Sequence, residues 1–177
     1  DPQDLATEMG PLATRRQLDQ IGRIVRESRD AGAELVTGGR PPAGLEAGFY
    51  YEPTILACPD GMIPSVMEEL FGPVLSVLTF EDEDEAVALA NGTPFGLASG
   101  VFTKNLTRAH RMIRRLRAGV VWVNTYRAVS PVVPFGGYGL SGLGREGGLE
   151  SVLDYTRTKS VWIRTSDAPI PDPFVMR

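Results

Sequence analysis

Between residues 72 and 124, segments typical of β-strands alternate with segments typical of amphipathic helices. The strand-like runs are 72–80, which has the composition of a buried strand, 97–103 and 120–124. An acid-rich run, 81–91, and a basic run, 105–119, predict the helices between them. Parallel strands need crossovers of this kind. The alternation therefore predicts an α/β fold with a mostly parallel sheet flanked by helices.

The N-terminal part adds a long helix and two strands. The segment from Thr14 to Gly32 has apolar residues at helical spacing, with Thr14 as the N-cap and Gly32 at its end. The runs 33–39 and 49–56 predict strands, and Pro53 restricts the second one to an edge or bent strand. These elements fit the same α/β class.

The C-terminal part has a different composition. Residues 131–148 contain too many glycines and prolines for a regular element, so they predict a long, shaped loop. The run 155–164 then predicts one more strand, followed by a proline-rich tail. This strand has no obvious partner in its own sheet, so we expect it to pair with another subunit or another domain.

Composition narrows the function classes. The net charge of −4 argues against nucleic acid as the main partner. The single cysteine excludes an internal disulfide framework and fits a reducing compartment, which favours a cytoplasmic protein. No apolar run approaches the ~18 residues that a membrane helix needs. The chain opens with neither an initiator methionine nor a signal peptide, so we expect it to be part of a longer protein.

Several motifs have simple structural interpretations. The loop matches the G-x-G-x-x-G pattern at 137–142 and at 142–147, but no strand precedes it, so we expect close packing rather than phosphate binding. Cys58 has no neighbouring cation, helix start or base and is interpreted as an inert thiol on a turn. The only histidine, His110, is interpreted as a solvated helix residue. No spacing typical of metal ligands occurs.

Basic residues on the second predicted helix admit two interpretations. They are Lys104, Arg108, Arg111, Arg114, Arg115 and Arg117. Such a face could bind an anion or nucleic acid. We favour a solvated face that lies near the acidic run 81–85 of the preceding helix.

The segment "MEELFGPVLSVLTF", residues 67–80, places two acids directly before a strand. A carboxylate at the entrance of a strand can accept hydrogen bonds from the hydroxyls of a ribose. Phe71, two residues after Glu69, would point to the same side and offer a flat apolar face to a ring. An ordinary acid at a sheet edge is the alternative, and periodicity alone does not decide between the two.

Four motifs in the same order and spacing carry a resemblance to a known family. They are "EMGPL", "EELFGPVLSV", "NGTPFGLASGVFT" and "AGVVWVN" followed by "PFGGYGLSGLGREGG". In these motifs, the chain resembles the NAD(P)-dependent aldehyde dehydrogenase superfamily from Asp1 to about Ile163. The resemblance implies part of an oxidoreductase that oxidises an aldehyde to a carboxylic acid with NAD or NADP.

The resemblance also implies roles for individual residues. Glu69 matches the glutamate that holds the nicotinamide ribose, and Phe71 matches the aromatic residue near the nicotinamide. Gln17 matches a position that reaches the adenosine-side ribose. Phe135 matches the aromatic residue that lines the aldehyde tunnel, and Glu146 matches a second carboxylate that assists proton movement. No metal is implied.

Two regions of the family fold are implied as well. Residues 1–142 match the C-terminal half of the catalytic domain, and residues 143–177 match the oligomerisation strand and tail. Within them, 126–133 matches the variable loop above the tunnel, and 155–164 matches the strand that joins subunits into a dimer or tetramer.

The family's chemistry is only partly represented in this chain. In the family, a cysteine thiolate attacks the aldehyde, and a general-base glutamate activates water against the resulting thioester. Both residues and the dinucleotide-binding domain lie upstream of the point that matches Asp1, and Cys58 does not match the nucleophile. The chain alone is therefore not expected to turn over aldehydes. Two alternatives stay open, a non-catalytic oligomerisation or interaction module and a fragment of a CoA-acylating aldehyde dehydrogenase.

Overall fold

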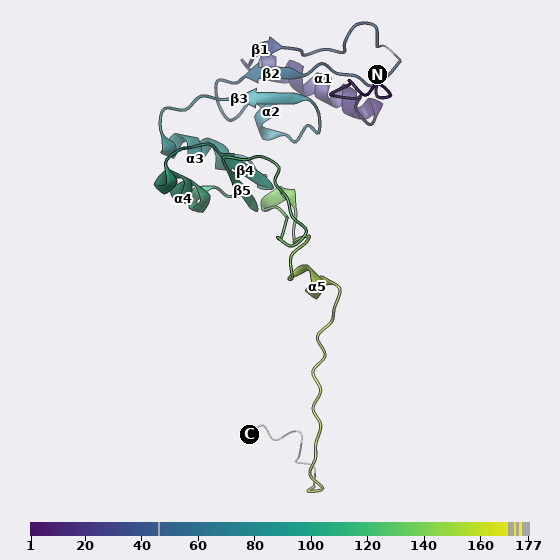
Figure 1. Cartoon of the computed structure of the whole chain (residues 1–177), viewed down its shortest axis with the longest axis vertical. Helices are drawn as coiled ribbons and strands as arrows, with labels where there is room; N and C mark the ends of the chain where they lie inside the picture. Colours follow the sequence, from purple (N-terminus) through teal and green to yellow (C-terminus); the bar gives the residue numbers. More distant parts are fainter. Residues whose placement is uncertain (46, 170–171, 173, 175–177) are drawn as a thin grey trace.

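The computed structural model of the chain describes residues 1–45, 47–169, 172 and 174. Figure 1 shows two α/β lobes and a long C-terminal segment that leads away from them. The first lobe contains α1 (Arg15–Asp30), β1 (Glu34–Thr37), β2 (Thr54–Ala57), α2 (Pro64–Met67) and β3 (Val74–Val77). The second lobe contains α3 (Glu83–Asn91), β4 (Ala98–Val101), α4 (Leu106–Arg115) and β5 (Val120–Val123). The short helices η1 (Gly139–Ser141) and α5 (Ser151–Asp154) follow.

Helix α1 forms where the sequence predicts it, because both of its ends carry the expected signals. The Thr14 hydroxyl accepts a hydrogen bond from the Gln17 backbone N–H at 3.2 Å, which satisfies one free amide of the first turn. Just beyond the last turn, Gly32 has a φ of +106°, a backbone conformation that residues with a side chain rarely adopt. The buried face of the helix covers the first sheet through Ile21, Val25 and their neighbours.

The first sheet has the order β1–β2–β3, with β1 antiparallel and β3 parallel to β2. Pro53 lacks an N–H, and the strand begins only after it. Thr54–Ala57 is therefore the central strand, and the expectation of an edge or bent strand is wrong for these residues. The core of this lobe consists of Ile21, Val25, Ala33, Tyr51, Leu56, Cys58 and Ile63. Burial raises the pKa of the Tyr51 phenol.

Cys58 belongs to this core. Its backbone N–H donates to the Val77 carbonyl at 2.8 Å, which extends the β2–β3 pairing by one residue. The thiol is free and only 8% exposed. The residue thus follows a strand directly and packs in the core, whereas the sequence predicts an inert thiol on a turn.

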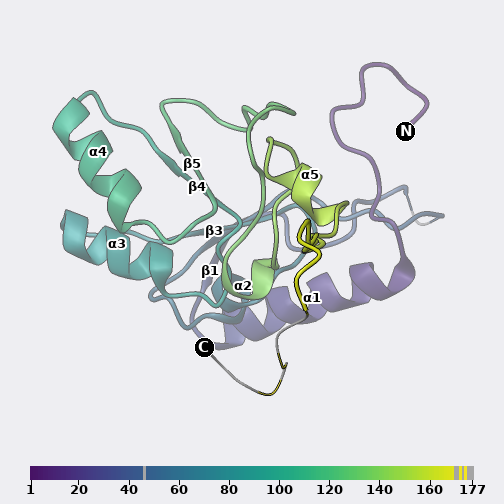
Figure 2. The same ribbon diagram turned by 90° about the horizontal axis from the view of Figure 1, so that it is seen from below.

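The second lobe is built on the parallel pair β4 and β5, with α3 and α4 side by side (Figures 1 and 2). Its core is small and consists of Val87, Met112 and Leu116. The expectation of an amphipathic helix is confirmed for α4, in which Ala109 and Met112 are buried, at 4% and 8% exposure. Two other apolar residues of this helix, Leu106 and Ile113, are 73% and 40% exposed.

The basic face of α4 pairs with the acidic start of α3. Glu83 accepts hydrogen bonds from Arg108 and, at 2.8 Å, from Nε of Arg111. Asp84 pairs with Arg115 at 2.6 Å. The hydrogen bonds from the two arginines hold the pKa of the Glu83 carboxyl below its usual range. This confirms the interpretation of a solvated basic face close to the acidic run, and His110 is exposed on the same helix.

One strand prediction needs correction. The run 72–80 was expected to be buried, yet Leu75 and Val77 of β3 are 57% and 42% exposed, because the described chain covers only one face of the strand. The run 155–164 forms no strand within the described chain, where no neighbouring segment offers it hydrogen bonds, so the strand expected at a subunit contact stays a prediction. It continues as an exposed trace after α5 (Figure 1).

Candidate functional site

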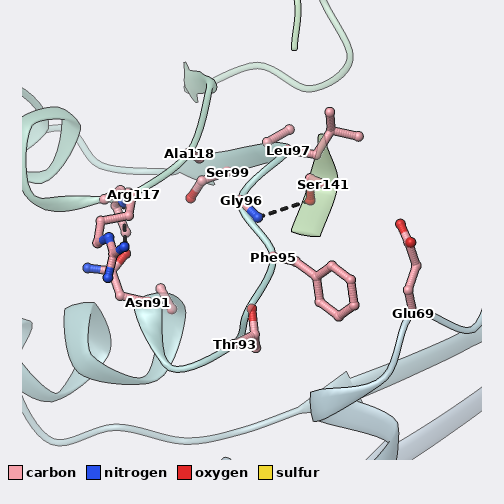
Figure 3. A pocket seen from close by; sticks show the side chains of 13 residues that line it. Glu69, Asn91, Thr93, Phe95, Gly96, Leu97, Ser99, Arg117, Ala118 and Ser141 are labelled. Carbon is pink, nitrogen blue, oxygen red and sulfur yellow. Dashed lines mark hydrogen bonds between the residues drawn. The ribbon is translucent and has the colours of Figure 1, made fainter. Parts of the chain in front are cut away.

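Glu69 lies in the turn that connects α2 to β3 and faces a cavity between the two lobes. The cavity has a volume of about 260 Å³, and the segments 90–99 and 116–118 of the second lobe line it together with Ser141. Among the described residues, none forms a hydrogen bond or an ion pair with the Glu69 carboxylate. Figure 3 shows Glu69 and the Phe95 ring projecting into the same space. The carboxylate is therefore available to a ligand.

The opposite wall of this cavity is held by a hydrogen bond across 45 positions of the sequence. The backbone N–H of Gly96 donates to the Ser141 hydroxyl at 3.0 Å, as the dashed line in Figure 3 marks. Gly96 precedes β4, and Ser141 ends η1. This bond fixes the glycine-rich loop against the entrance of β4, so both walls of the cavity have defined backbones.

Phe71 presents its ring from the same turn as Glu69. Its side chain is 72% exposed, and its φ of +51° lies in the left-handed region. The alternation of a strand predicts Phe71 and Glu69 on the same side. This prediction is wrong, because β3 begins only at Val74 and the two residues belong to an irregular turn.

Gln17 reaches this turn from the first turn of α1. Its side-chain amide donates from Nε2 to the carbonyl of Phe71, 54 positions away. Its Oε1 accepts from the backbone N–H of Ala13 at 3.2 Å. The structure thus brings Gln17, at the N-terminal end of α1, to the turn that carries Glu69 and Phe71.

Phe135 and Glu146 form a second group. Their backbones pair as an isolated antiparallel bridge, with both N···O distances at 2.7 Å. Both residues line a cavity of about 450 Å³ with Val129, Ser130, Pro131, Val133 and Gly147. The lining is mostly apolar, and Glu146 is its one carboxylate among the described residues.

The two groups adjoin each other. A further cavity of about 660 Å³ contains both Phe135 and Glu146, and it shares Leu97 and Ser141 with the cavity that Glu69 lines. A continuous hollow surface therefore leads from Glu69 along the glycine-rich loop to Phe135.

The glycine-rich loop packs closely, as expected from its composition. A side-chain carbon at Gly119 would lie 1.7 Å from the Gly136 carbonyl oxygen, so the loop can approach β5 only because Gly119 has no side chain. No strand leads into either G-x-G-x-x-G match among the described residues. The geometry favours backbone packing over phosphate binding there.

Comparison with known proteins assigns the family. Residues 1–161 match the sequence profile of the aldehyde dehydrogenase family. The chain belongs to the aldehyde dehydrogenase family. This confirms the resemblance that the four sequence motifs carry.

Individual relatives agree with this assignment. A (Z)-2-((N-methylformamido)methylene)-5-hydroxybutyrolactone dehydrogenase of Acinetobacter baylyi is 61% identical over 99% of this chain, which covers 36% of that relative. The crystal structure of PnpE from Pseudomonas sp. WBC-3 has a TM-score of 0.90 and 43% identity, over 98% of this chain and 36% of PnpE. A Mycobacterium tuberculosis aldehyde dehydrogenase complexed with NAD⁺ has a TM-score of 0.86 and 37% identity, over 94% of this chain and 34% of the enzyme. The chain thus spans about a third of the length of these family members.

Some lining residues of this aldehyde dehydrogenase segment were not singled out from sequence. Thr93, Phe95 and Leu97 line the cavity opposite Glu69, and Ser141 fixes its wall. They fall inside the motifs "NGTPFGLASGVFT" and "PFGGYGLSGLGREGG", so the motif matches were the available signal. The residue types in these motifs do not by themselves indicate which side chains line the cavity and which only form turns.

Within residues 1–45, 47–169, 172 and 174, no group of histidine, cysteine and acidic side chains has the arrangement of a metal site. Likewise, none of the helices described is both long and apolar enough to span a lipid bilayer.

Proposed function

We propose that this chain is the C-terminal part of an NAD(P)⁺-dependent aldehyde dehydrogenase that oxidises an aldehyde to a carboxylic acid. The observation that carries the proposal is the unpaired Glu69 carboxylate at the cavity between the lobes, in the same turn as the exposed Phe71. The family match, and the NAD⁺ bound by the related M. tuberculosis enzyme, support a nicotinamide nucleotide as the ligand.

The turn before β3 would hold the nicotinamide end of the nucleotide. A carboxylate accepts hydrogen bonds from both hydroxyls of a ribose, and Glu69 has no internal partner among the described residues that competes for them. Phe71, exposed in the same turn, would offer an apolar ring face. Gln17 belongs to the same nucleotide-facing group. When bound, NAD⁺ or NADP⁺ supplies the hydride acceptor of the reaction.

The apolar cavity around Phe135 would receive the aldehyde. Phe135 and Glu146 line its wall together with residues of the loop 126–133. In this proposal Glu146 would assist proton movement. The nucleophilic thiolate would come from the remainder of the longer enzyme, because Cys58 is buried in the core of the first lobe. The chain alone is not expected to oxidise aldehydes.

The C-terminal segment would join subunits. In this proposal residues 1–142 belong to the catalytic domain of a cytoplasmic enzyme, and residues 143–177 form the oligomerisation region. The exposed Tyr155 and Trp162, at 91% and 95%, support an interface at 155–164. Addition of this segment to the sheet of a second subunit would provide hydrogen-bond partners for its backbone.

The same exposed segment favours one alternative function, a non-catalytic module that assembles with a complete subunit. The intact mass of the protein from its source cell separates the two. A species several hundred residues longer supports the enzyme, whereas a native mass near 19.2 kDa supports the assembly module.

Replacement of Glu69 tests the nucleotide site. In the native-length protein, Glu69→Gln should weaken NAD⁺ binding or slow hydride transfer about tenfold or more, since a lost hydrogen bond to a charged group costs about 1.5–3 kcal/mol. Nucleotide binding is measured by calorimetry and hydride transfer in single-turnover experiments.

The neighbouring acid provides the matched control. Glu68 makes only a long ion pair with Arg23, at 3.7 Å, so Glu68→Gln should leave both quantities unchanged. Unchanged turnover together with lower thermal stability in Glu69→Gln would instead identify Glu69 as a structural acid at the strand edge.

A further inference from the structure

The turn that carries Glu69 and Phe71 is attached to α1 at several points. Leu70 packs against the core of the first lobe. A side-chain carbon at Gly72 would lie 2.1 Å from Cδ1 of Ile21, so the backbone of the turn rests directly on the buried face of α1. The third attachment is the hydrogen bond from Gln17 to the Phe71 carbonyl. The position of the turn is therefore set by the helix.

Gln17 serves two structural groups at once. It stands three residues after the N-cap Thr14, where a glutamine side chain commonly returns to the free N–H groups at the helix start. Here Oε1 accepts from Ala13, while Nε2 donates to Phe71. Both ends of the amide are engaged with backbone, which links the start of α1 to the turn.

The backbone of Phe71 needs such support. A residue other than glycine in the left-handed region is strained, and it persists only where the surroundings fix it. The carbonyl that Gln17 holds belongs to the strained residue itself. Loss of this bond would free the turn to relax and would move the Phe71 ring and the Glu69 carboxylate together.

We propose that Gln17 is a positioning residue, which acts through the Phe71 carbonyl to set the Phe71 ring and the Glu69 carboxylate. Its effect on nucleotide binding rests on the proposed nucleotide site, whereas its effect on the turn is independent of any ligand.

Gln17→Glu separates positioning from ribose contact. Glutamate keeps an acceptor for Ala13 and could still accept from ribose hydroxyls, but it has no donor for the Phe71 carbonyl. We expect amide hydrogen exchange at residues 69–74 of the native-length protein to rise about three- to tenfold, the range expected for one lost hydrogen bond. The Kd for NAD⁺, measured by calorimetry, should rise by a similar factor.

Two further variants complete the experiment. Gln20→Glu introduces the same charge one turn along α1, and Gln20 makes no side-chain hydrogen bond within the described part of the chain. In Gln20→Glu, hydrogen exchange at residues 69–74 should match the wild type. A rise as large as that in Gln17→Glu would show that the added charge causes the faster exchange, and would overturn the inference. Gln17→Met removes the donor without adding charge, so it gives the same reading if Gln17→Glu does not fold.

Each combination of results has a definite meaning. Unchanged exchange in both Gln17 variants overturns the positioning role. Faster exchange with an unchanged Kd in Gln17→Glu, while Glu69→Gln weakens NAD⁺ binding, overturns the link to the ligand and leaves the proposed function standing. If Glu69→Gln does not affect NAD⁺ binding either, the proposed nucleotide site fails, and the exchange data still decide the role of Gln17 in the turn.

Discussion

The two lobes of the chain are stabilised in different ways. In the first lobe, Ile21, Ile24 and Leu56 are completely buried. In the second lobe the buried apolar residues keep 4–8% exposure, and only Val87, Met112 and Leu116 form a cluster. The second lobe instead has many polar contacts between its helices, strands and loops. Similar strand–helix patterns therefore need not produce equally deep cores.

Asparagine side chains supply much of this polar support. Asn91, at the end of α3, donates to the Arg115 carbonyl at 2.9 Å and accepts from the Arg117 N–H at 2.8 Å. Asn124, directly after β5, both accepts from and donates to the backbone of Thr103 at 2.8 Å. Each amide provides a donor and an acceptor, as a neighbouring strand would.

A matched pair of leucine variants gives the largest expected effects. Leu56→Ala should destabilise β2 near the upper end of the ~2–5 kcal/mol range for such changes, because a fully buried side chain leaves a cavity. Leu116→Ala should destabilise β5 near the lower end, since Leu116 is 7% exposed and borders two cavities. Hydrogen exchange in β2 and β5 of the native-length protein measures both losses of stability. Equal losses in the two strands would contradict the inference that the first lobe has the deeper core.

Removal of the Asn91 amide should have an intermediate effect. Asn91→Ala deletes two hydrogen bonds that hold the turn from α4 to β5, and each contributes about 0.5–1.5 kcal/mol. Exchange protection should fall in β5 and remain unchanged in β2. Asn91→Asp, which keeps the acceptor for Arg117, should lose less than Asn91→Ala, and identical losses would show that the amide acts only by filling space.

The smallest effect is expected at Glu83, and it depends on pH. The folded-state pKa of this carboxyl is lowered by hydrogen bonds from Arg108 and Arg111, so its stabilising contribution is present above the unfolded pKa. That contribution is lost as the pH falls through the lowered folded-state value. Glu83→Gln should therefore be less stable than the wild type at neutral pH, and the two should converge in acid. Glu81→Gln, at an acid that forms no ion pair among the described residues, is the control variant in a melting series over pH.

Local signals in the sequence predicted local structure well. Thr14, Asp82 and Asn105 cap the three longer helices through hydrogen bonds to residues two or three positions away, so short segments suffice to locate those helices. The acids of α3 and the arginines of α4 also paired as expected from their order along the chain.

Features that depend on distant segments were not predictable in this way. The bond from Gln17 to Phe71 joins positions 54 apart, and the left-handed backbone of Phe71 has no signal in its own residue type, which is rare in that region. The exposure of Leu75 depends on what covers β3, which its own alternation does not specify. The family motifs predict a ribose-binding role for Glu69. The connection of its turn to Gln17 is visible only in the structure.

The backbone of Phe71 has a consequence for attempts to make this protein more heat-resistant. Glycine adopts its left-handed conformation with little strain, so a screen for thermostability alone would favour glycine at this position. Such a variant would gain resistance to unfolding and lose the aromatic face that the turn would present to the proposed nucleotide. Stability and activity are therefore opposed at a single residue, which makes position 71 a site to exclude from stability engineering.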